Sequence, residues 1–253
     1  MGRAKSGGNQ DGAQGRAPHR FRWIVIAAIS ISISVACTIA LSTIVLSYYR
    51  DVRALRSENA PLQEMADALE LGTQYVSNIS SFDVEMRKIN PDYVCWIRMD
   101  GTLVNYPVVR AADNEKYLDT SFSGERNMLG TLFMDYRSVD EQVPHIIIYG
   151  HNSRDGDMFG ELWKFVDGRH LAAHPIITLI VDGRFVEYEI FSARVTDVTD
   201  PAYNLDLSDP GSFHAFLESC GAPLDSTQIL TLSTCVSGDD DDERVVVQAF
   251  LRG

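Results

Sequence analysis

The chain has 253 residues, of which 45% are hydrophobic and 23% are charged, and these proportions are ordinary for a folded protein. Its net charge of −13 argues against a nucleic acid as the partner, because phosphate binding needs clustered lysines and arginines. The four cysteines form no CxxC pair and have no metal-ligand spacing, so no metal site is expected.

An uncharged stretch near the N-terminus predicts a membrane anchor. Residues 1–22 are expected to form a short cytoplasmic tail, and residues 23–49 (WIVIAAISISISVACTIALSTIVLSYY) a transmembrane signal anchor. At about 1.5 Å per residue, the uncharged part from Ile24 to Leu46 is long enough to cross a bilayer core of roughly 30 Å. The serines in this stretch do not exclude a membrane helix, because a helical serine can bond back to its own backbone.

The flanking charges indicate the orientation of this anchor. Four arginines and a lysine precede it against a lone Asp11, and positive flanks favour the cytoplasmic side. We therefore expect a single-pass type II protein of the cell membrane, with the domain that follows the anchor outside the cell. A cleaved signal peptide is the rival interpretation, but its apolar core is usually shorter. A lipoprotein cleavage site at Ala36-Cys37 is disfavoured, because Ser34 stands where a bulky apolar residue is expected.

Residues 50–89 predict an N-terminal helical region. Their apolar residues recur at helical intervals, and Pro61 is expected to break the helix into two pieces. The sequence SFDVE at 81–85 resembles the capped start of a further short helix.

After Asn90-Pro91 the pattern changes to short β-rich runs separated by Gly, Asp, Asn and Pro. Asp182-Gly183 between two of these runs is a strong hairpin signal. Eight strands at this spacing suggest a closed barrel or a sandwich, interrupted by helical inserts at 158–166 and 208–220. The expected fold class is therefore mainly β with α. The predicted strands are 94–99, 103–109, 130–135, 145–150, 176–181, 184–198, 227–235 and 244–252.

One predicted strand, TLSTC at 231–235, ends on a cysteine. A thiolate is a nucleophile, but a free cysteine is mostly protonated at neutral pH and needs a nearby cation or base. His151 at the end of HIIIYG and Arg244 at the start of the last strand are the candidates, since strand ends place side chains at a barrel rim. Each residue also has an ordinary structural reading, in which Cys235 is an inert small hydrophobe and the other two are surface residues.

Cys95 and Cys220 face an oxidising compartment if the predicted orientation is right. A disulfide between them and two separate buried thiols both remain open, and the second alternative is preferred.

Several motifs together resemble one family. TLSTC, followed by the arginine that opens RVVV, is similar to the TLxTC…R signature of sortases, the membrane-anchored cysteine transpeptidases of Gram-positive bacteria. WIRMDGTLVNYPVV, DNEKYLDTSF, GTLFMDYR and YGHNSRDGDMFGELWKF resemble class B sortases in order and spacing, and the likeness covers about residues 83–253. It implies an eight-stranded sortase-type β-barrel over residues 90–253 and a chemistry that needs no cofactor.

The resemblance also implies roles for particular residues. Cys235 would be the nucleophile, and His151 the general acid for the departing amine and the base for the incoming one. Arg244 would hold the substrate carbonyl and the developing oxyanion. For Leu118, simple core packing is an equally good reading. The substrate-contacting positions that the resemblance implies are Asn114, Leu118, Tyr149 and Ser233.

The implied function is cleavage of a C-terminal sorting signal of surface proteins after threonine, through a Cys235 thioester. An amine of a peptidoglycan precursor or of a pilin lysine would then release the acyl group. Two alternatives remain open: a membrane-anchored cysteine hydrolase, and a catalytically silent barrel that binds wall peptides or assists pilus assembly.

The residues after the cysteine depart from the family pattern. Family members often carry an acidic or aromatic residue there, whereas this chain has Val236-Ser237-Gly238. The acidic run at 239–243 is expected to form a solvated turn, with a calcium site as the minor alternative.

Overall fold

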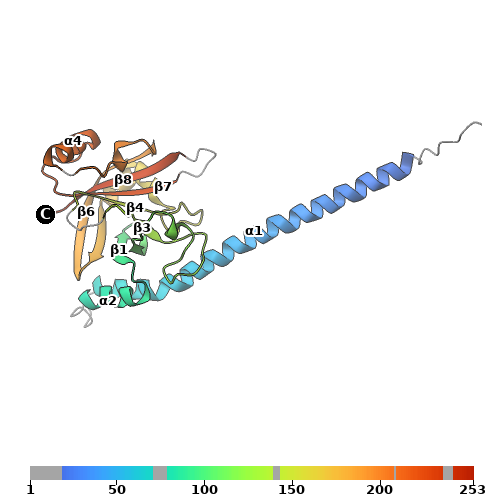
Figure 1. Ribbon diagram of the computed structural model, residues 1–253, viewed down its shortest axis with the longest axis horizontal. Coiled ribbons are helices and arrows are strands. Elements are labelled where there is room, and N and C mark those ends of the chain that lie inside the picture. Colours follow the sequence, from blue (N-terminus) through green and yellow to red (C-terminus); the bar gives the residue numbers. More distant parts are fainter. Residues whose placement is uncertain (1–18, 71–78, 139–142, 208, 236–241) are drawn as a thin grey trace, which may run out of the picture. The chain divides into compact units, whose positions relative to one another are not determined.

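The computed structural model describes residues 19–70, 79–138, 143–207, 209–235 and 242–253 (Figure 1). The chain divides after Tyr49 into two compact units, residues 1–49 and residues 50–253. Helix α1 (His19–Glu70) contributes its first part to one unit and its last part to the other.

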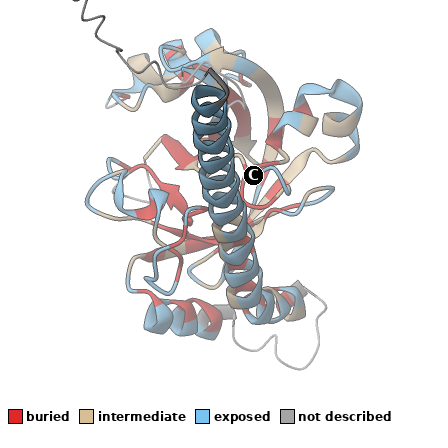
Figure 2. Cartoon of the chain, turned by 90° about the vertical axis from the view of Figure 1, so that its right-hand side faces the viewer, coloured by how far each residue is buried: buried red, intermediate tan, exposed pale blue. Residues whose placement is uncertain are grey.

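The first part of α1 is apolar and exposed. Side chains from residue 21 to residue 46 are all exposed, as the pale blue of Figure 2 shows. Among the described residues, α1 is the one helix that is long and apolar enough to cross a membrane, judged by length and composition. Four hydroxyls in this part donate to backbone carbonyls three or four residues earlier, which is the back-bonding expected in an apolar helix. These bonds are made by Ser32, Thr38, Thr43 and Ser47, at 2.7–2.9 Å.

The last part of α1 packs on the barrel, and the predicted break at Pro61 is wrong. The helix continues through Pro61 to Glu70. A proline inside a helix costs about 3 kcal/mol because it removes one backbone hydrogen bond. Burial of an apolar stripe outweighs this cost, since each buried aliphatic side chain contributes about 1.5–3 kcal/mol. The stripe consists of Val52, Leu55, Leu62, Ala66 and Leu69, each at most 8% exposed.

Eight strands close into one barrel in the order β1-β2-β3-β4-β7-β8-β6-β5, which decides between the predicted barrel and the sandwich. The pairs β2–β3 and β4–β7 are parallel, and the other pairs are antiparallel. Every predicted strand matches an observed one to within two residues at each end. The strands are β1 Tyr93–Met99, β2 Asn105–Val109, β3 Leu132–Met134, β4 His145–Tyr149, β5 Ile176–Val181, β6 Arg184–Asp197, β7 Ile229–Cys235 and β8 Glu243–Leu251.

Most of the turns and helices predicted from local sequence signals are confirmed. Asp182 and Gly183 both have positive φ, as the two-residue turn between β5 and β6 requires. The helix α2 (Ile79–Ile89) contains the predicted capped segment. The helix predicted at 158–166 is wrong in its first half, because Met158 has a φ of 55° and cannot continue a right-handed helix. A 3₁₀ helix, η3 (Leu162–Val166), and the short α3 (Gly168–Ala173) follow instead.

A crossover of residues 198–228 connects β6 to β7. It contains the short η4 (Pro201–Tyr203) and α4 (Pro210–Cys220), whose first turn is capped by Asp209. Phe216 and Leu217 of α4 pack with Ile229 of β7 in one apolar cluster. Cys220 is half-buried and Cys95 is buried, and both are free thiols, so the alternative of a disulfide between them does not hold.

His145, at the start of β4, is a buried histidine that must be neutral. Its Nδ1 lies 2.7 Å from the carbonyl oxygen of Asn204, which only accepts, so Nδ1 carries the proton. Nε2 therefore accepts the hydroxyl proton of Thr231 at 2.8 Å. Burial lowers the pKa of His145 to about 4, although the Asn204 carbonyl and the charge of Asp135 oppose this.

This burial predicts a loss of stability in mild acid. Between pH 6.5 and about 4 the unfolded chain protonates residue 145 and the folded chain does not, so lowering the pH favours unfolding. At about 1.4 kcal/mol per pH unit, the free energy of unfolding should fall by about 3 kcal/mol on this account. Urea unfolding of residues 50–253 at pH 7 and pH 4 measures the loss. In His145→Gln, whose amide cannot titrate, the loss should be smaller by that amount. An equal loss in both proteins would contradict the prediction.

Candidate active site

Cys235 and Arg244 are direct neighbours across the β7–β8 pair. Cys235 is the last residue of β7, and its Cα partner in the antiparallel register is Arg244. Side chains directly opposite each other in such a pair have Cβ atoms about 4.5–5.5 Å apart. The thiol side chain is exposed, and the guanidinium is partly exposed with Nη1 donating to the backbone oxygen of Glu243 at 2.9 Å. The cysteine and the arginine therefore meet at the rim of the barrel.

His151 reaches the same rim from the other side of β7. In the parallel β4–β7 pair Tyr149 lies beside Ser233, and the N–H of Gly150 donates to the Ser233 carbonyl at 3.2 Å. His151 lies two residues after Tyr149, and Cys235 lies two residues after Ser233, so the two residues reach the same end of the barrel. The amide of Asn152 closes this side by donating to the Cys235 carbonyl at 2.8 Å.

The ring of His151 is held by a backbone carbonyl. Its Nε2 lies 2.7 Å from the carbonyl oxygen of Leu118, the last residue of η2 (Lys116–Leu118). Because that oxygen can only accept, Nε2 carries a proton, and in the neutral ring the lone pair is on Nδ1. The side chain of Leu118 is 42% exposed, so core packing does not explain this residue.

Glycine is required just before His151. A Cβ at Gly150 would lie 2.3 Å from Cδ2 of Leu132 and 2.8 Å from Cδ2 of Phe159. A larger residue would therefore require the side chains of Leu132 and Phe159, or the backbone before His151, to shift.

Asp135 joins two of the predicted substrate-contacting residues. This fully buried carboxylate accepts from Asn114 at 3.1 Å, from the Tyr149 hydroxyl at 3.0 Å and from Arg137 in two bonds. Burial alone would raise the pKa of Asp135, but the hydrogen bonds from Arg137 and Asn114 hold it below its ordinary value. The other end of the Asn114 amide accepts from the backbone N–H of Tyr136 at 3.0 Å. Asn114 is thus engaged at both ends.

Ser233 is buried two residues before Cys235, and its partner is a residue that the sequence did not indicate. Its hydroxyl lies 2.8 Å from the hydroxyl of Tyr203, the last residue of η4. Burial raises the pKa of Tyr203, although the hydrogen bond with Ser233 and the positive charge of Arg244 oppose this. Tyr203 therefore lies within electrostatic reach of Arg244.

Comparison with known proteins assigns the family. A family model described as the sortase domain matches residues 97–252. Sortase B of Listeria monocytogenes is 32% identical over 180 residues, which cover 66% of this chain and 72% of that protein. The crystal structure of Staphylococcus aureus sortase B superposes with a TM-score of 0.70 at 27% identity, covering 78% of this chain and 98% of that one. The structure of a sortase B complexed with triglycine also gives a TM-score of 0.70 at 27% identity, covering 79% and 98%.

The chain belongs to the sortase family. It is a homologue of sortase B and hence a cysteine transpeptidase. The predicted family and the predicted enzyme class are therefore confirmed.

One cavity in this sortase lies away from the rim. It has a volume of about 690 Å³ and is lined by Gln228, just before β7, and by Leu251, the end of β8. Cys235 and Arg244 occupy the opposite ends of the same two strands, so the cavity opens at the other end of the barrel. Within the described part of the chain, no group of three or more His, Cys, Asp or Glu could hold a metal ion. Most of the acidic run, residues 239–241, and residues 236–238 lie outside the described residues.

Sequence analysis missed Asn152 and Tyr203 at this sortase site. Asn152 directly follows His151, and its side chain fixes the end of β7. A polar residue beside a candidate base is a signal that could have found it. Tyr203 lies 32 residues before Cys235 in the crossover, and only the barrel order brings η4 back to β7.

Proposed function

We propose that this sortase cleaves a C-terminal sorting signal of surface proteins through a Cys235 thioester and transfers the acyl group to an amine. The observation that carries the proposal is the register of β7, which sets Cys235 opposite Arg244 and level with His151. These are the three residue types that thiol acyl transfer uses: a nucleophile, an acid–base group and a donor to the oxyanion.

The proposed reaction has two halves. The Cys235 thiolate attacks the threonyl carbonyl carbon, and Arg244 donates hydrogen bonds to the oxyanion that forms. The C–N bond breaks as His151 gives its proton to the departing amine. The acyl group remains bound to Cys235 as a thioester. The acceptor amine then attacks the thioester, His151 takes up its proton, and the Cys235 thiolate is released. The proton that His151 gives up in the first half is thus restored in the second.

The bond from His151 to Leu118 suggests which nitrogen exchanges this proton. The Nε2–H···O=C bond is compatible with both the neutral ring and the imidazolium, because Nε2 is a donor in both. Nδ1 would then be the nitrogen that gains and loses the proton. The Leu118 carbonyl would also stabilise the charged ring, since a hydrogen bond to a charged donor is stronger than one to a neutral donor.

The acyl donor would lie along the wall made by β4, β7 and the 113–118 segment. The four residues named for substrate contact border this wall. Tyr149 and Ser233 are adjacent in register, and the exposed side chain of Leu118 belongs to the residue whose carbonyl holds His151. Asn114 belongs to the same wall through Asp135. We propose that Asn114, Leu118, Tyr149 and Ser233 contact the sorting signal.

For the acceptor, we propose a primary amine of a peptidoglycan precursor. The support is that a sortase B structure contains triglycine, a short peptide with a free amine. A pilin lysine offers the same chemistry, and the experiment below separates the two.

We also propose that residues 23–49 are an uncleaved anchor of a type II membrane protein. The support is the exposed apolar helix and the positive charge before it. Residues 1–22 would remain in the cytoplasm, and the barrel would face outward.

The transfer reaction can be tested with a peptide library. Wild-type protein is incubated with five-residue signal peptides plus triglycine or Nα-acetyl-lysine, and products are identified by mass spectrometry. We expect a ligated product with triglycine, and none in Cys235→Ala. Cys95→Ala, which removes a buried thiol, should retain transfer and serves as the control. Preference for the lysine would assign a pilin-type acceptor. Hydrolysed donor with either amine would indicate a hydrolase, and unchanged turnover in Cys235→Ala would refute the proposal.

Arg244→Lys tests the oxyanion role. Lysine keeps the charge but loses the rigid fork of donors, and the contribution should be greatest in the transition state. We expect turnover to fall roughly a hundredfold or more, as is typical for removal of one oxyanion donor. The measurement is kcat and KM for the ligation product. Arg252→Ala, which removes an exposed pair at the other end of β8, should be near normal. Near-normal turnover with a raised KM in Arg244→Lys would assign Arg244 to docking alone.

Protease protection tests the orientation. In intact cells, a tag inserted at residue 5 should survive external protease, whereas a tag at residue 60 should be cut. A mature protein that begins at Cys37, or a cut tag at residue 5, would contradict the proposal.

A further inference from the structure

Tyr203 is carried by a loop that is tied down on both sides. The short η4 stands between Asp200 and Asn204, and each of these residues is bonded to the barrel wall. Between them the Tyr203 hydroxyl rests on Ser233 at 2.8 Å. The two ties are the ends of one continuous series of hydrogen bonds.

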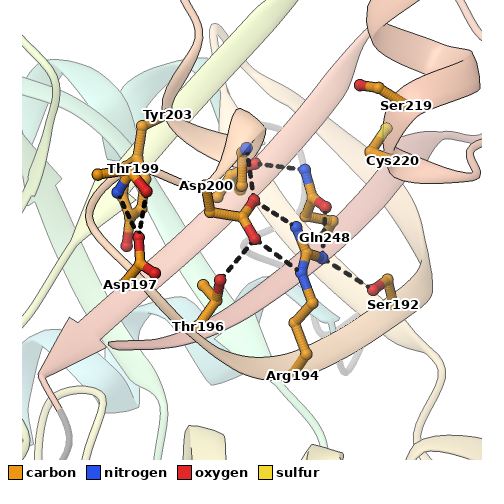
Figure 3. Close-up of polar contacts among 12 residues, drawn as sticks. Ser192, Arg194, Thr196, Asp197, Thr199, Asp200, Tyr203, Ser219, Cys220 and Gln248 are labelled. Atoms are coloured by element: carbon orange, nitrogen blue, oxygen red, sulfur yellow. Dashed lines mark hydrogen bonds and ion pairs between the residues drawn. The ribbon is translucent and has the colours of Figure 1, made fainter. Parts of the chain in front are cut away.

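The first tie is an ion pair between the loop and β6. Arg194 donates to the Asp200 carboxylate at 2.6 and 3.2 Å, and the Thr196 hydroxyl donates to it at 2.6 Å (Figure 3). The same carboxylate accepts from the backbone N–H of Ala202 at 2.7 Å and so caps η4. The Asp200 side chain is only 11% exposed. A shielded pair of this kind fixes the loop more firmly than a surface pair, which is worth only about 0–1 kcal/mol.

The second tie is a series of hydrogen bonds that begins at Arg194 and ends at Asn204 in the loop. Arg194 also donates to Gln248 Oε1 at 2.8 Å, as Figure 3 shows, and Gln248 Nε2 donates to the Thr231 hydroxyl at 3.3 Å. That hydroxyl donates to Nε2 of His145, whose Nδ1–H donates to the Asn204 carbonyl. Gln248, Thr231 and His145 are each at most 1% exposed. We call these six residues the polar chain: Asp200, Arg194, Gln248, Thr231, His145 and Asn204.

Donation in the polar chain runs outward from Arg194, to Asp200 on one side and through Gln248, Thr231 and His145 to Asn204 on the other. Each of these bonds has one donor and one acceptor, with neutral His145 accepting from Thr231 and donating to Asn204. Because these groups are buried, breaking one link would leave its neighbours unpaired, at about 1–3 kcal/mol for each such group. The chain therefore has one stable arrangement, and it determines where η4 lies.

We propose that Arg194, Gln248 and His145 are positioning residues of this sortase, which hold Tyr203 against Ser233 at the acyl-donor side of the site. They do not touch the reacting atoms and act through Tyr203. Their effect on acyl transfer rests on the proposed function. Their effect on the position of the loop that carries Tyr203 does not depend on it.

The first test measures the loop without any substrate. Hydrogen exchange followed by mass spectrometry is carried out on the full chain in detergent micelles. In Gln248→Leu we expect the amides of residues 202–207 to exchange at least tenfold faster, while those of β7 next to Ser233 stay protected. Arg194→Lys keeps one bond to Asp200 but cannot span to Gln248, and we expect an intermediate rate. Arg252→Ala, another arginine paired to β6 carboxylates, should behave as wild type. Unchanged exchange at 202–207 in Gln248→Leu would overturn the proposal.

The second test is a double-mutant cycle in transfer. With the donor peptide selected from the library and triglycine, Gln248→Leu should raise KM for the donor roughly tenfold and leave KM for triglycine unchanged. In a Tyr203→Ala background the same substitution should change donor KM less than twofold, because the residue it positions is gone. Equal losses in both backgrounds, or loss of kcat alone together with a lower melting temperature, would show a merely structural role. Absence of transfer in the wild type would refute the proposed function, and the exchange measurement would still decide the positioning role.

Discussion

The alternation of β7 is the constraint on which the site depends. Successive residues of a strand point to opposite faces, so Thr231, Ser233 and Cys235 share one face. Leu230 and Leu232 on the other face are fully buried in the core. A shift of one residue would move these leucines out of the core and into the buried polar layer around Thr231 and Ser233, and it would turn the thiol toward the core. The apolar face therefore fixes which residues are presented at the rim.

The residues on the thiol-bearing face of β7 have different surroundings, and each therefore has a different role. Ile229 packs against α4, Thr231 takes part in the polar chain, Ser233 meets Tyr203, and Cys235 reaches solvent. The crossover covers the first three and leaves the last one accessible. One strand thus passes from apolar packing, through a buried polar layer, to an exposed thiol within seven residues.

Two tyrosines border Ser233, and each is held by a carboxylate that an arginine neutralises. Asp135 with Arg137 binds the hydroxyl of Tyr149 directly. Asp200 with Arg194 acts on Tyr203 through the cap of η4. Ordering a loop costs about 1–2 kcal/mol of backbone entropy for each residue, and such anchors offset that cost at the places where substrate must be bound.

The barrel could be predicted from the sequence because its signals are local, whereas the choice of the three rim residues rested on the resemblance to sortases. Apolar runs mark the strands, and TLSTC with a following arginine marks two neighbours in one antiparallel pair. The helix through Pro61 could not be predicted, because its stability comes from packing on the barrel. Nor could Tyr203, whose partners come from strands far away in the sequence. A residue positioned by tertiary hydrogen bonds leaves no local pattern.

At the rim, catalysis would depend on how the side chains are positioned and not on their burial in the free protein. Cys235 is exposed, and its neighbour Arg244 is partly open to water. Burial raises the pKa of the Cys95 thiol and so disfavours its nucleophilic thiolate form, and Cys235 is not buried in this way. A bound donor peptide would cover the rim and remove water from Arg244 and His151, and charge interactions strengthen as water leaves. Because Tyr149 and Tyr203 are already fixed in the free protein, the donor peptide could cover the rim without having to order the loop that carries Tyr203. More of its binding energy is then available to stabilise the transition state.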